Sequence, residues 1–227
     1  AGAQITLARA EWALGDHAVA WERLHRARIS RPWDTSISAQ LRAWAQEQPH
    51  LNADRSAQAA ARRAAARPPR VASDPNARDG VPTVRVALAE NLSSVFLKPG
   101  AGATLRRGAP PTASEAVPIP RDDAVLQVAI VDGVIVVRDE EGQRLVDSLA
   151  PVSVEYDVPG STTTIFSLTF GSGQFRAGRE DRSYRGSIEL RPTRGPDGRA
   201  GAFSVINELS VEEYLYSVVP SEIPAWW

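Results

Sequence analysis

The chain has 227 residues, of which 43% are hydrophobic, and its 26 basic and 27 acidic side chains leave a formal net charge of −1. This composition is typical of a globular protein, and the near-zero net charge gives no electrostatic reason to expect nucleic acid or an anionic membrane surface as a partner. The absence of cysteine excludes disulfides, thiolate metal sites and a cysteine nucleophile.

The sequence begins with alanine and contains no methionine, so we expect the natural start, with any signal peptide or lipid anchor, to lie upstream. No apolar run approaches the length needed to cross a bilayer.

Residues 4–48 place apolar side chains at helical intervals and predict two antiparallel helices that turn near Gly15 and Asp16, followed by a third helix over 36–48. The stretch "LARAEWALGDHAVAWERLHRARISRP" resembles a tetratricopeptide repeat in its small and large positions. A single repeat cannot bury its own face, so we expect earlier repeats upstream. The tryptophans are expected to pack between helices rather than form a ligand cage: Trp12, Trp21, Trp33 and Trp44. The histidines are expected at the surface or between helices, because their spacing matches no metal site: His17, His25 and His50.

The next segment, "NADRSAQAAARRAAARPPR", favours helix but offers few large apolar side chains, which predicts a solvated, partly helical linker. A basic patch for an anionic polymer is the alternative. The sequence "RPPRVASDPNARDGVP" then breaks regular structure. We therefore divide the chain into tetratricopeptide-like helices (1–50), a linker (51–80) and a third domain (81–227).

From residue 81 the pattern changes to short segments rich in β-branched and aromatic residues, which predict an antiparallel β domain. The whole chain is therefore expected to be α+β. Asp132 and Gly133 predict a two-residue hairpin turn. The expected strands are "TVRVALA", "SVFLKP", "AVLQVAIV", "GVIVVRD", "PVSVEYDV", "TTTIFSLTF", "GQFRAG", "YRGSIELRP" and "AFSVINE".

Three charged segments, "DDAVL", "RDEEG" and "REDRS", are expected to be solvated turns. The adjacent carboxylates of Asp122 with Asp123, or of Glu140 with Glu141, could hold a hard cation weakly.

The segment "LSVEEYLYSVV" predicts a final amphipathic helix. Ser210 and Glu213 have the spacing of a capping box, in which each side chain bonds a backbone N–H of the first turn. Pro220 is expected to end the helix at Val219. Its apolar face would be formed by Val211, Tyr214, Leu215 and Val218.

Residues 51–227 contain neither histidine nor cysteine, which excludes a Ser-His-Asp triad, a Cys-His pair and an imidazole metal site. The closing segment "VVPSEIPAWW" places Glu222 among apolar residues, which would raise the pKa of its carboxyl group if it were buried. Glu222 is therefore a candidate acid.

Several segments resemble, in order, the SpoIID/LytB family of bacterial cell-wall proteins (stage II sporulation protein D and the amidase enhancer LytB). They are Tyr184-Arg185-Gly186, Val205-Ile206-Asn207, "VEEYL" at 211–215, and "VPSE" at 219–222 with Pro224, and the upstream strand "VRVALAENLSSVFLK" is also similar. Together they cover about the last two-thirds of the chain.

The resemblance implies an extracytoplasmic, peptidoglycan-directed protein whose sporulation relatives resemble lytic transglycosylases with one essential glutamate, matched here by Glu222. It implies no cofactor or metal. Substrate contacts are expected from Ser221, Tyr216, Trp226 and Trp227, although packing in the core is the alternative for both tryptophans.

The expected partners are peptidoglycan glycan strands, with a cell-wall amidase or another protein bound through residues 1–50. The resemblance also implies further helical sequence after residue 227, so we expect the 227-residue chain alone to be inactive or barely active. Two other functions stay open. The chain could be a non-catalytic enhancer of a cell-wall amidase, or a scaffold whose helical repeats carry the function.

Overall fold

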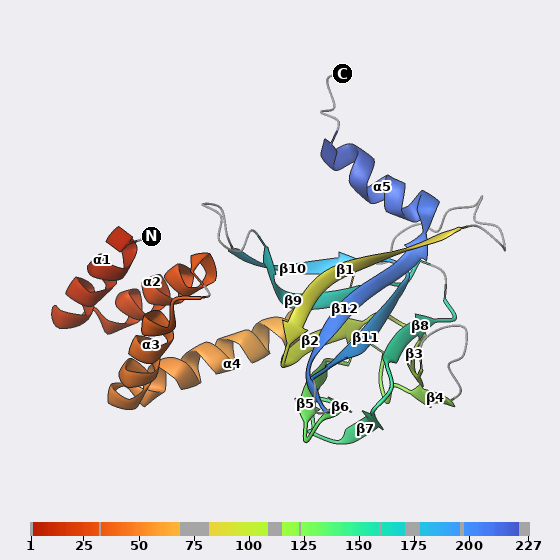
Figure 1. The fold of residues 1–227 in the computed structure, drawn as a ribbon, viewed down its shortest axis with the longest axis horizontal. Helices are drawn as coiled ribbons and strands as arrows, with labels where there is room; N and C mark the ends of the chain where they lie inside the picture. Colours follow the sequence, from red (N-terminus) through yellow and green to blue (C-terminus); the bar gives the residue numbers. More distant parts are fainter. Residues whose placement is uncertain are drawn as a thin grey trace. The chain divides into compact units, whose positions relative to one another are not determined.

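A computed structural model describes residues 2–31, 33–68, 82–108, 115–122, 124–158, 160–170, 178–195 and 198–222 (Figure 1). For residues 115, 170 and 217–222 it describes only the backbone. The chain divides into two compact units, Ala1–Ala66 with Ser167–Glu180, and Arg67–Phe166 with Asp181–Trp227. Helices come first and two antiparallel sheets follow, so the expected α+β class is confirmed.

Four helices form the N-terminal part of the first unit: α1 (Gly2–Ala13), α2 (His17–Ser30), α3 (Thr35–Glu47) and α4 (Pro49–Ala65). The predicted turn between α1 and α2 is confirmed, with Gly15 at a φ of 91° that favours glycine. Asp34 caps α3 by accepting a hydrogen bond from the backbone N–H of Ser36 at 3.1 Å. Pro49 begins α4, where its missing N–H costs no helical hydrogen bond.

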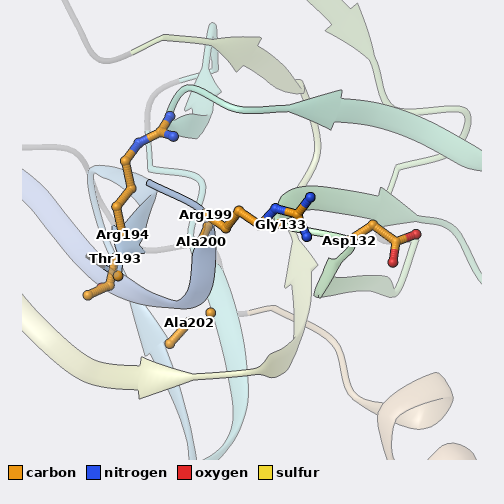
Figure 2. A pocket seen from close by; sticks show the side chains of 9 residues that line it. Asp132, Gly133, Thr193, Arg194, Arg199, Ala200 and Ala202 are labelled. Carbon is orange, nitrogen blue, oxygen red and sulfur yellow. The ribbon is translucent and has the colours of Figure 1, made fainter. Parts of the chain in front are cut away.

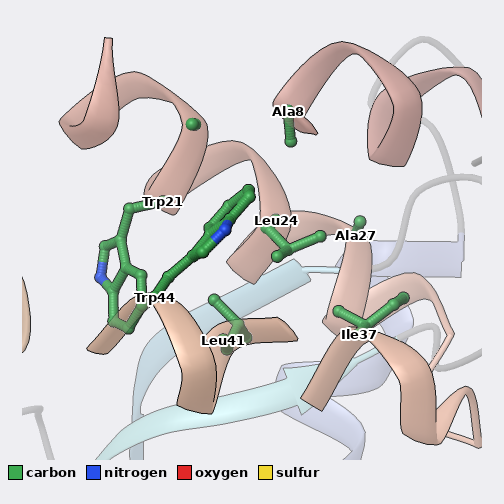
Figure 3. Packing of buried hydrophobic residues seen from close by; sticks show 8 residues of the cluster. Ala8, Trp21, Leu24, Ala27, Ile37, Leu41 and Trp44 are labelled. Atoms are coloured by element: carbon green, nitrogen blue, oxygen red, sulfur yellow. The ribbon is translucent and has the colours of Figure 1, made fainter. Parts of the chain in front are cut away.

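The helical core combines small and large side chains (Figure 3). The ring of Trp44 stacks on that of Trp12, with centroids 4.1 Å apart and planes 1° from parallel. The expectation that the tryptophans pack between helices is confirmed for Trp12, Trp21 and Trp44, but it is wrong for Trp33, which is 66% exposed. The buried members of the cluster are Ala8, Ala20, Trp21, Leu24, Ala27, Ile37, Leu41 and Trp44.

The strands form two six-stranded sheets. The order of the first sheet is β1-β12-β11-β8-β3-β4, with β1 (Thr83–Leu92), β12 (Ala200–Ser210), β11 (Ser187–Arg194), β8 (Val152–Tyr156), β3 (Ala103–Arg107) and β4 (Glu115–Pro118). The order of the second is β10-β9-β2-β5-β6-β7, with β10 (Gly178–Tyr184), β9 (Thr163–Phe170), β2 (Ser94–Pro99), β5 (Leu126–Val131), β6 (Val134–Arg138) and β7 (Arg144–Ser148). One helix, α5 (Val211–Glu222), follows β12 directly.

The core of the second unit lies where β12 packs against β5 and β6 of the other sheet. Alternate side chains of β12 are buried, because successive residues of a strand point to opposite faces of its sheet. Phe203 is fully buried and is the largest of the fully buried side chains among the described residues. Its buried companions include Leu105, Leu126, Val128, Ile135, Val154, Ile188, Leu190 and Val205.

The predicted hairpin at Asp132 and Gly133 is confirmed. The two residues have φ values of 51° and 83°, and they join β5 to β6 through the Val131–Val134 pair. Positive φ at both central positions is the geometry of a type I′ turn, whose twist matches that of the flanking strands.

Two expectations about β structure were wrong or incomplete. The charged segment "REDRS" lies inside strand β10 rather than in a turn. β10 is an edge strand, where charged side chains reach water from both faces. The strands β3, β4 and β7 were not predicted, and most of the expected strand "GQFRAG" lies outside the described residues.

Candidate functional site

Helix α5 carries the candidate acid. Its backbone is helical from Val211 through Pro220 to Glu222, so the predicted end at Val219 was wrong. Proline has no backbone N–H, so the carbonyl of Tyr216 loses its helical hydrogen bond. The loss costs little here, because Pro220 lies in the last turn of the helix and few helical hydrogen bonds come after it. The side chains of Ser221 and Glu222 lie outside the described residues, as do Trp226 and Trp227 entirely.

The start of α5 is fixed by two hydrogen bonds. Ser210 Oγ accepts from the backbone N–H of Glu213 at 3.2 Å, which is the serine half of the predicted capping box. The N–H of Val211 donates to the carbonyl of Pro82 at 3.0 Å, just before β1. The acidic first turn, with Glu212 and Glu213, also suits the positive end of the helix dipole.

The predicted apolar face of α5 is only partly covered. The helix packs against β12 and β1, and Val211 and Tyr214 are half-buried. Leu215 is 47% exposed and Tyr216 is 59% exposed, so the described residues leave the Leu215 part of the predicted apolar face uncovered. The side chain of Tyr216 is therefore accessible from outside the described part of the chain.

A buried amide links the strand before α5 to a neighbouring turn. Asn207 is 4% exposed, and its Nδ2 donates to the carbonyls of Arg185 at 2.7 Å and Ser187 at 3.1 Å. These bonds satisfy a polar group on the otherwise apolar inner face of β12. Asn207 therefore holds the chain between β10 and β11 against β12, four residues before α5 begins.

Gly186, at the centre of that turn, has two separate reasons to be glycine. Its φ is 75°, in the left-handed region. An added Cβ would also lie 2.3 Å from the carbonyl oxygen of Glu208 and 2.7 Å from Cβ of Leu209. The turn can therefore approach β12 this closely only because residue 186 has no side chain.

An ion cluster around the buried Glu189 lies on the other face of the same sheet. Glu189 on β11 is 1% exposed, and its two carboxylate oxygens are bound by Arg85 and by Nε of Arg191, the latter at 2.6 Å. Arg85 also lies 3.8 Å from Glu208. Arginine groups contact both oxygens of Glu189, so removing either arginine would leave a buried carboxylate oxygen without that partner. This cluster could not be predicted from the sequence, because the segment "IELRP" carries no distinguishing pattern.

The described carboxylates suggested as cation ligands make ion pairs or hydrogen bonds with other residues of the protein. Glu140 and Glu141 both pair with Arg121, at 3.2 and 3.5 Å. Asp122 accepts a backbone hydrogen bond at 3.2 Å, and Asp123 lies outside the described residues. No group of three or more histidine, aspartate or glutamate side chains suited to a metal ion occurs in the part of the chain that the structure describes.

The helical unit contains one histidine with a strongly altered acidity. His25 packs edge-on against Trp21, with ring centroids 4.8 Å apart, and its buried Nε2 has no hydrogen-bond partner among the described residues. Burial, and then the positive charges of Arg55 and Arg28, lower the pKa of His25 from its ordinary 6.5 to about 4. His25 therefore stays neutral near pH 7, in keeping with the inter-helix role expected for it.

Comparisons with known proteins found no matching family model, no matching curated protein and no matching solved structure. Among the described residues, no helix is long and apolar enough to span a membrane.

Proposed function

We propose that this protein acts on bacterial cell-wall peptidoglycan as a lytic transglycosylase of the SpoIID/LytB type, with Glu222 as its general acid and base. The observation that carries the proposal is the ordered set of segments in the last third of the chain, from Tyr184-Arg185-Gly186 to "VPSE" at 219–222. Its support from the fold is that these segments are neighbours in space: Asn207 binds the turn at Arg185, and Ser210 caps the helix that runs to Glu222.

The proposed chemistry needs one carboxyl group and neither cofactor nor metal. Protonated Glu222 would donate its proton to the leaving oxygen between N-acetylmuramic acid and N-acetylglucosamine. The ionised carboxylate would then take the proton of the C6 hydroxyl of muramic acid, whose oxygen attacks the anomeric carbon. The products are a free N-acetylglucosamine end with a 4-hydroxyl group and a 1,6-anhydromuramic acid end, so no water is consumed.

The remaining assignments concern binding and location. We assign substrate contacts to Ser221, Tyr216, Trp226 and Trp227, of which Tyr216 has the described exposed side chain. The proposal places the protein outside the cytoplasm, in the cell envelope, where its substrate lies. Residues 1–50 would then bind a protein partner.

The experiment is a digest of purified glycan strands by the full-length protein, with mass spectrometry for 1,6-anhydromuramic ends. Both peptide-bearing and peptide-free strands should be offered. Glu222→Gln should abolish the anhydro ends, because an amide cannot donate the proton. Glu212→Gln is the matched control, since Glu212 is an exposed glutamate in the first turn of the same helix, and it should retain activity.

A second candidate is a non-catalytic enhancer of a cell-wall amidase. The observation that favours it is the exposed pair Leu215 and Tyr216, adjacent on α5 and available to a protein partner. If neither type of strand yields anhydro ends, the transglycosylase proposal is wrong. Stimulation of an amidase that survives Glu222→Gln and is lost in Leu215→Ser would then support the enhancer.

A further inference from the structure

Charged side chains of α2, α4 and the start of β10 gather around His25 in the first unit. His25 and Arg28 are three positions apart on α2 and therefore lie on the same side of the helix. Arg55 of α4 reaches this side of α2, because it forms an ion pair with Glu22. Arg179, the second residue of β10, belongs to the same unit, and its positive charge also acts on His25. Arg28, Arg55 and Arg179 are called the arginine cluster below.

The arginine cluster has more positive than negative charge. Within the described part of the chain, the side chains of Arg28 and Arg179 form no ion pair and no hydrogen bond. Burial, and then the charge of Arg55, lower the pKa of Arg28. Burial, and then the charges of Arg28 and Arg55, lower the pKa of Arg179. The three guanidinium groups therefore lie close enough to repel one another, and an anion among them would relieve this repulsion.

Two buried ring nitrogens next to the cluster are also available to a ligand. Trp21 is 4% exposed, and its ring packs edge-on against that of His25, with the centroids 4.8 Å apart. Nε1 of Trp21 and Nε2 of His25 are buried, and neither has a hydrogen-bond partner among the described residues. The indole N–H can only donate, so it suits an oxygen acceptor. A buried donor without an acceptor is unfavourable, which gives an anion a second reason to bind here.

We propose that the arginine cluster, with His25 and Trp21 beside it, binds a dianionic phosphate group, either free phosphate or the phosphate of a monoester. Three guanidinium groups and the carboxylate of Glu22 give the site a charge of about +2, since His25 is neutral near pH 7. A phosphate monoester carries a charge of about −1.5 to −2 at this pH, whereas a carboxylate carries only −1. Guanidinium groups also offer parallel N–H donors that match the oxygens of a phosphate.

The experiment uses the full-length protein and three probes, inorganic phosphate, glycerol 3-phosphate and acetate, at an ionic strength held constant with chloride. NMR follows the indole N–H of Trp21 and the ring of His25. At least one of the two phosphates should bind with a dissociation constant at least tenfold lower than that of acetate. The tighter of the two identifies the ligand as a monoester or as free phosphate. Saturating phosphate should also raise the pKa of His25 by about one unit or more, because a nearby negative charge favours the protonated ring.

Equal affinity for acetate and both phosphates would overturn the proposal, as would the absence of any saturable shift at Trp21 and His25. Either result would mean that the arginine cluster is not selective for a dianion.

Two variants on different elements test the cluster itself. Arg28→Gln and Arg179→Gln should each weaken phosphate binding about tenfold or more. Without phosphate, neither should lower the urea midpoint of the first unit, because each removes a repulsive charge rather than an ion pair. Arg26→Gln is the control, since Arg26 is an exposed arginine of α2 whose charge is not among those that act on His25, and it should bind normally. Unchanged phosphate binding in both cluster variants would reject the site.

The site is independent of the proposed cleavage reaction. Glu222→Gln should bind phosphate as well as the unaltered protein does. Absence of anhydro ends with intact phosphate binding would therefore reject the cleavage proposal alone. Anhydro ends formed by a protein that does not bind phosphate would reject this site alone.

Discussion

Two single residues, one on each side of the contact, determine how closely the chain between β10 and β11 approaches β12. Asn207 supplies two hydrogen bonds from the β12 side, and Gly186 supplies the space. The two residues are 21 positions apart in the sequence, so no local pattern indicates that they act together. The contact explains physically why both residue types are needed, whatever the protein's activity.

We predict that Gly186→Ala lowers the free energy of unfolding of the second unit by about 3 kcal/mol. The reason is the sum of an unfavourable left-handed φ and a close approach to the Glu208 carbonyl, which is backbone and cannot move aside. Urea unfolding measures the loss. Gly142→Ala is the control, with a φ of 82° but no atom within 4 Å of the added Cβ, and it should cost about 1 kcal/mol. Equal losses would show that packing at Gly186 is unimportant.

We predict that the helical unit loses stability as the pH falls below about 6.5. The pKa of His25 is about 4 in the folded protein and 6.5 when exposed, so the unfolded chain binds a proton first. Stability is therefore fully present above pH 6.5, decreases between pH 6.5 and 4, and is constant below. Because His25 keeps part of its surface in water, we expect a loss of about 1–2 kcal/mol.

NMR titration of the His25 ring and urea unfolding at pH 7 and 5 measure this effect. His25→Gln should remove most of the pH dependence, whereas His50→Gln, at an exposed position in α4, should leave it. A pKa near 6.5 for His25 would contradict the packing described for its ring.

At the scale of elements, the stability of helix α5 depends on the hydrogen bond that caps its first turn. We predict that Ser210→Ala increases amide hydrogen exchange in α5 about fivefold, the equivalent of about 1 kcal/mol, because the N–H of Glu213 loses its acceptor. Ser210→Asp should restore protection, since aspartate also caps helices. If the alanine variant exchanges no faster, the contact of α5 with β1 and β12 rather than the cap holds the helix.

The elements that the sequence predicted best are those with a strong local signal. The β-branched and aromatic residues of "SVFLKP" match β2, and the Asp-Gly pair matches the type I′ turn. β10 was missed because its charged side chains resemble a turn, and only its place at a sheet edge makes them acceptable in a strand. The end of α5 was misjudged because a proline in a last turn removes few helical bonds.

At the scale of the whole molecule, the chain has two hydrophobic cores. We predict that Leu24→Ala, in the helical core, lowers the stability of the first unit by about 2–5 kcal/mol and leaves the unfolding of the second unit unchanged. Scanning calorimetry should then show one transition shifted and the other not. Leu14→Ala is the control, because Leu14 is 81% exposed, and it should shift neither. A common shift of both transitions would mean that the units unfold together.

The candidate site was only partly predictable at this scale. Glu222 stands out in the sequence because it is an acid among prolines and apolar residues. The surface pocket between the β5–β6 turn and the β11–β12 hairpin (Figure 2) does not, because its described walls lie 60 or more positions apart in the sequence and consist mainly of glycine and alanine. Small residues leave no periodic signal, and their meaning appears only when the fold leaves space beside them.

Because β12 leads directly into α5, a small change of angle at the end of the strand displaces the far end of the helix. Ser210 ends the strand and caps the helix, with no loop between them to absorb a change in angle. A helix of 12 residues is about 18 Å long at 1.5 Å per residue, so a tilt of about 10° at Ser210 displaces its far end by about 3 Å. If Glu222 is the acid as proposed, this matters, because a misplacement of about 1 Å already slows catalysis by such a group. Small distortions of the sheet at Asn207 or Gly186 are thus magnified at Glu222, far from where they arise.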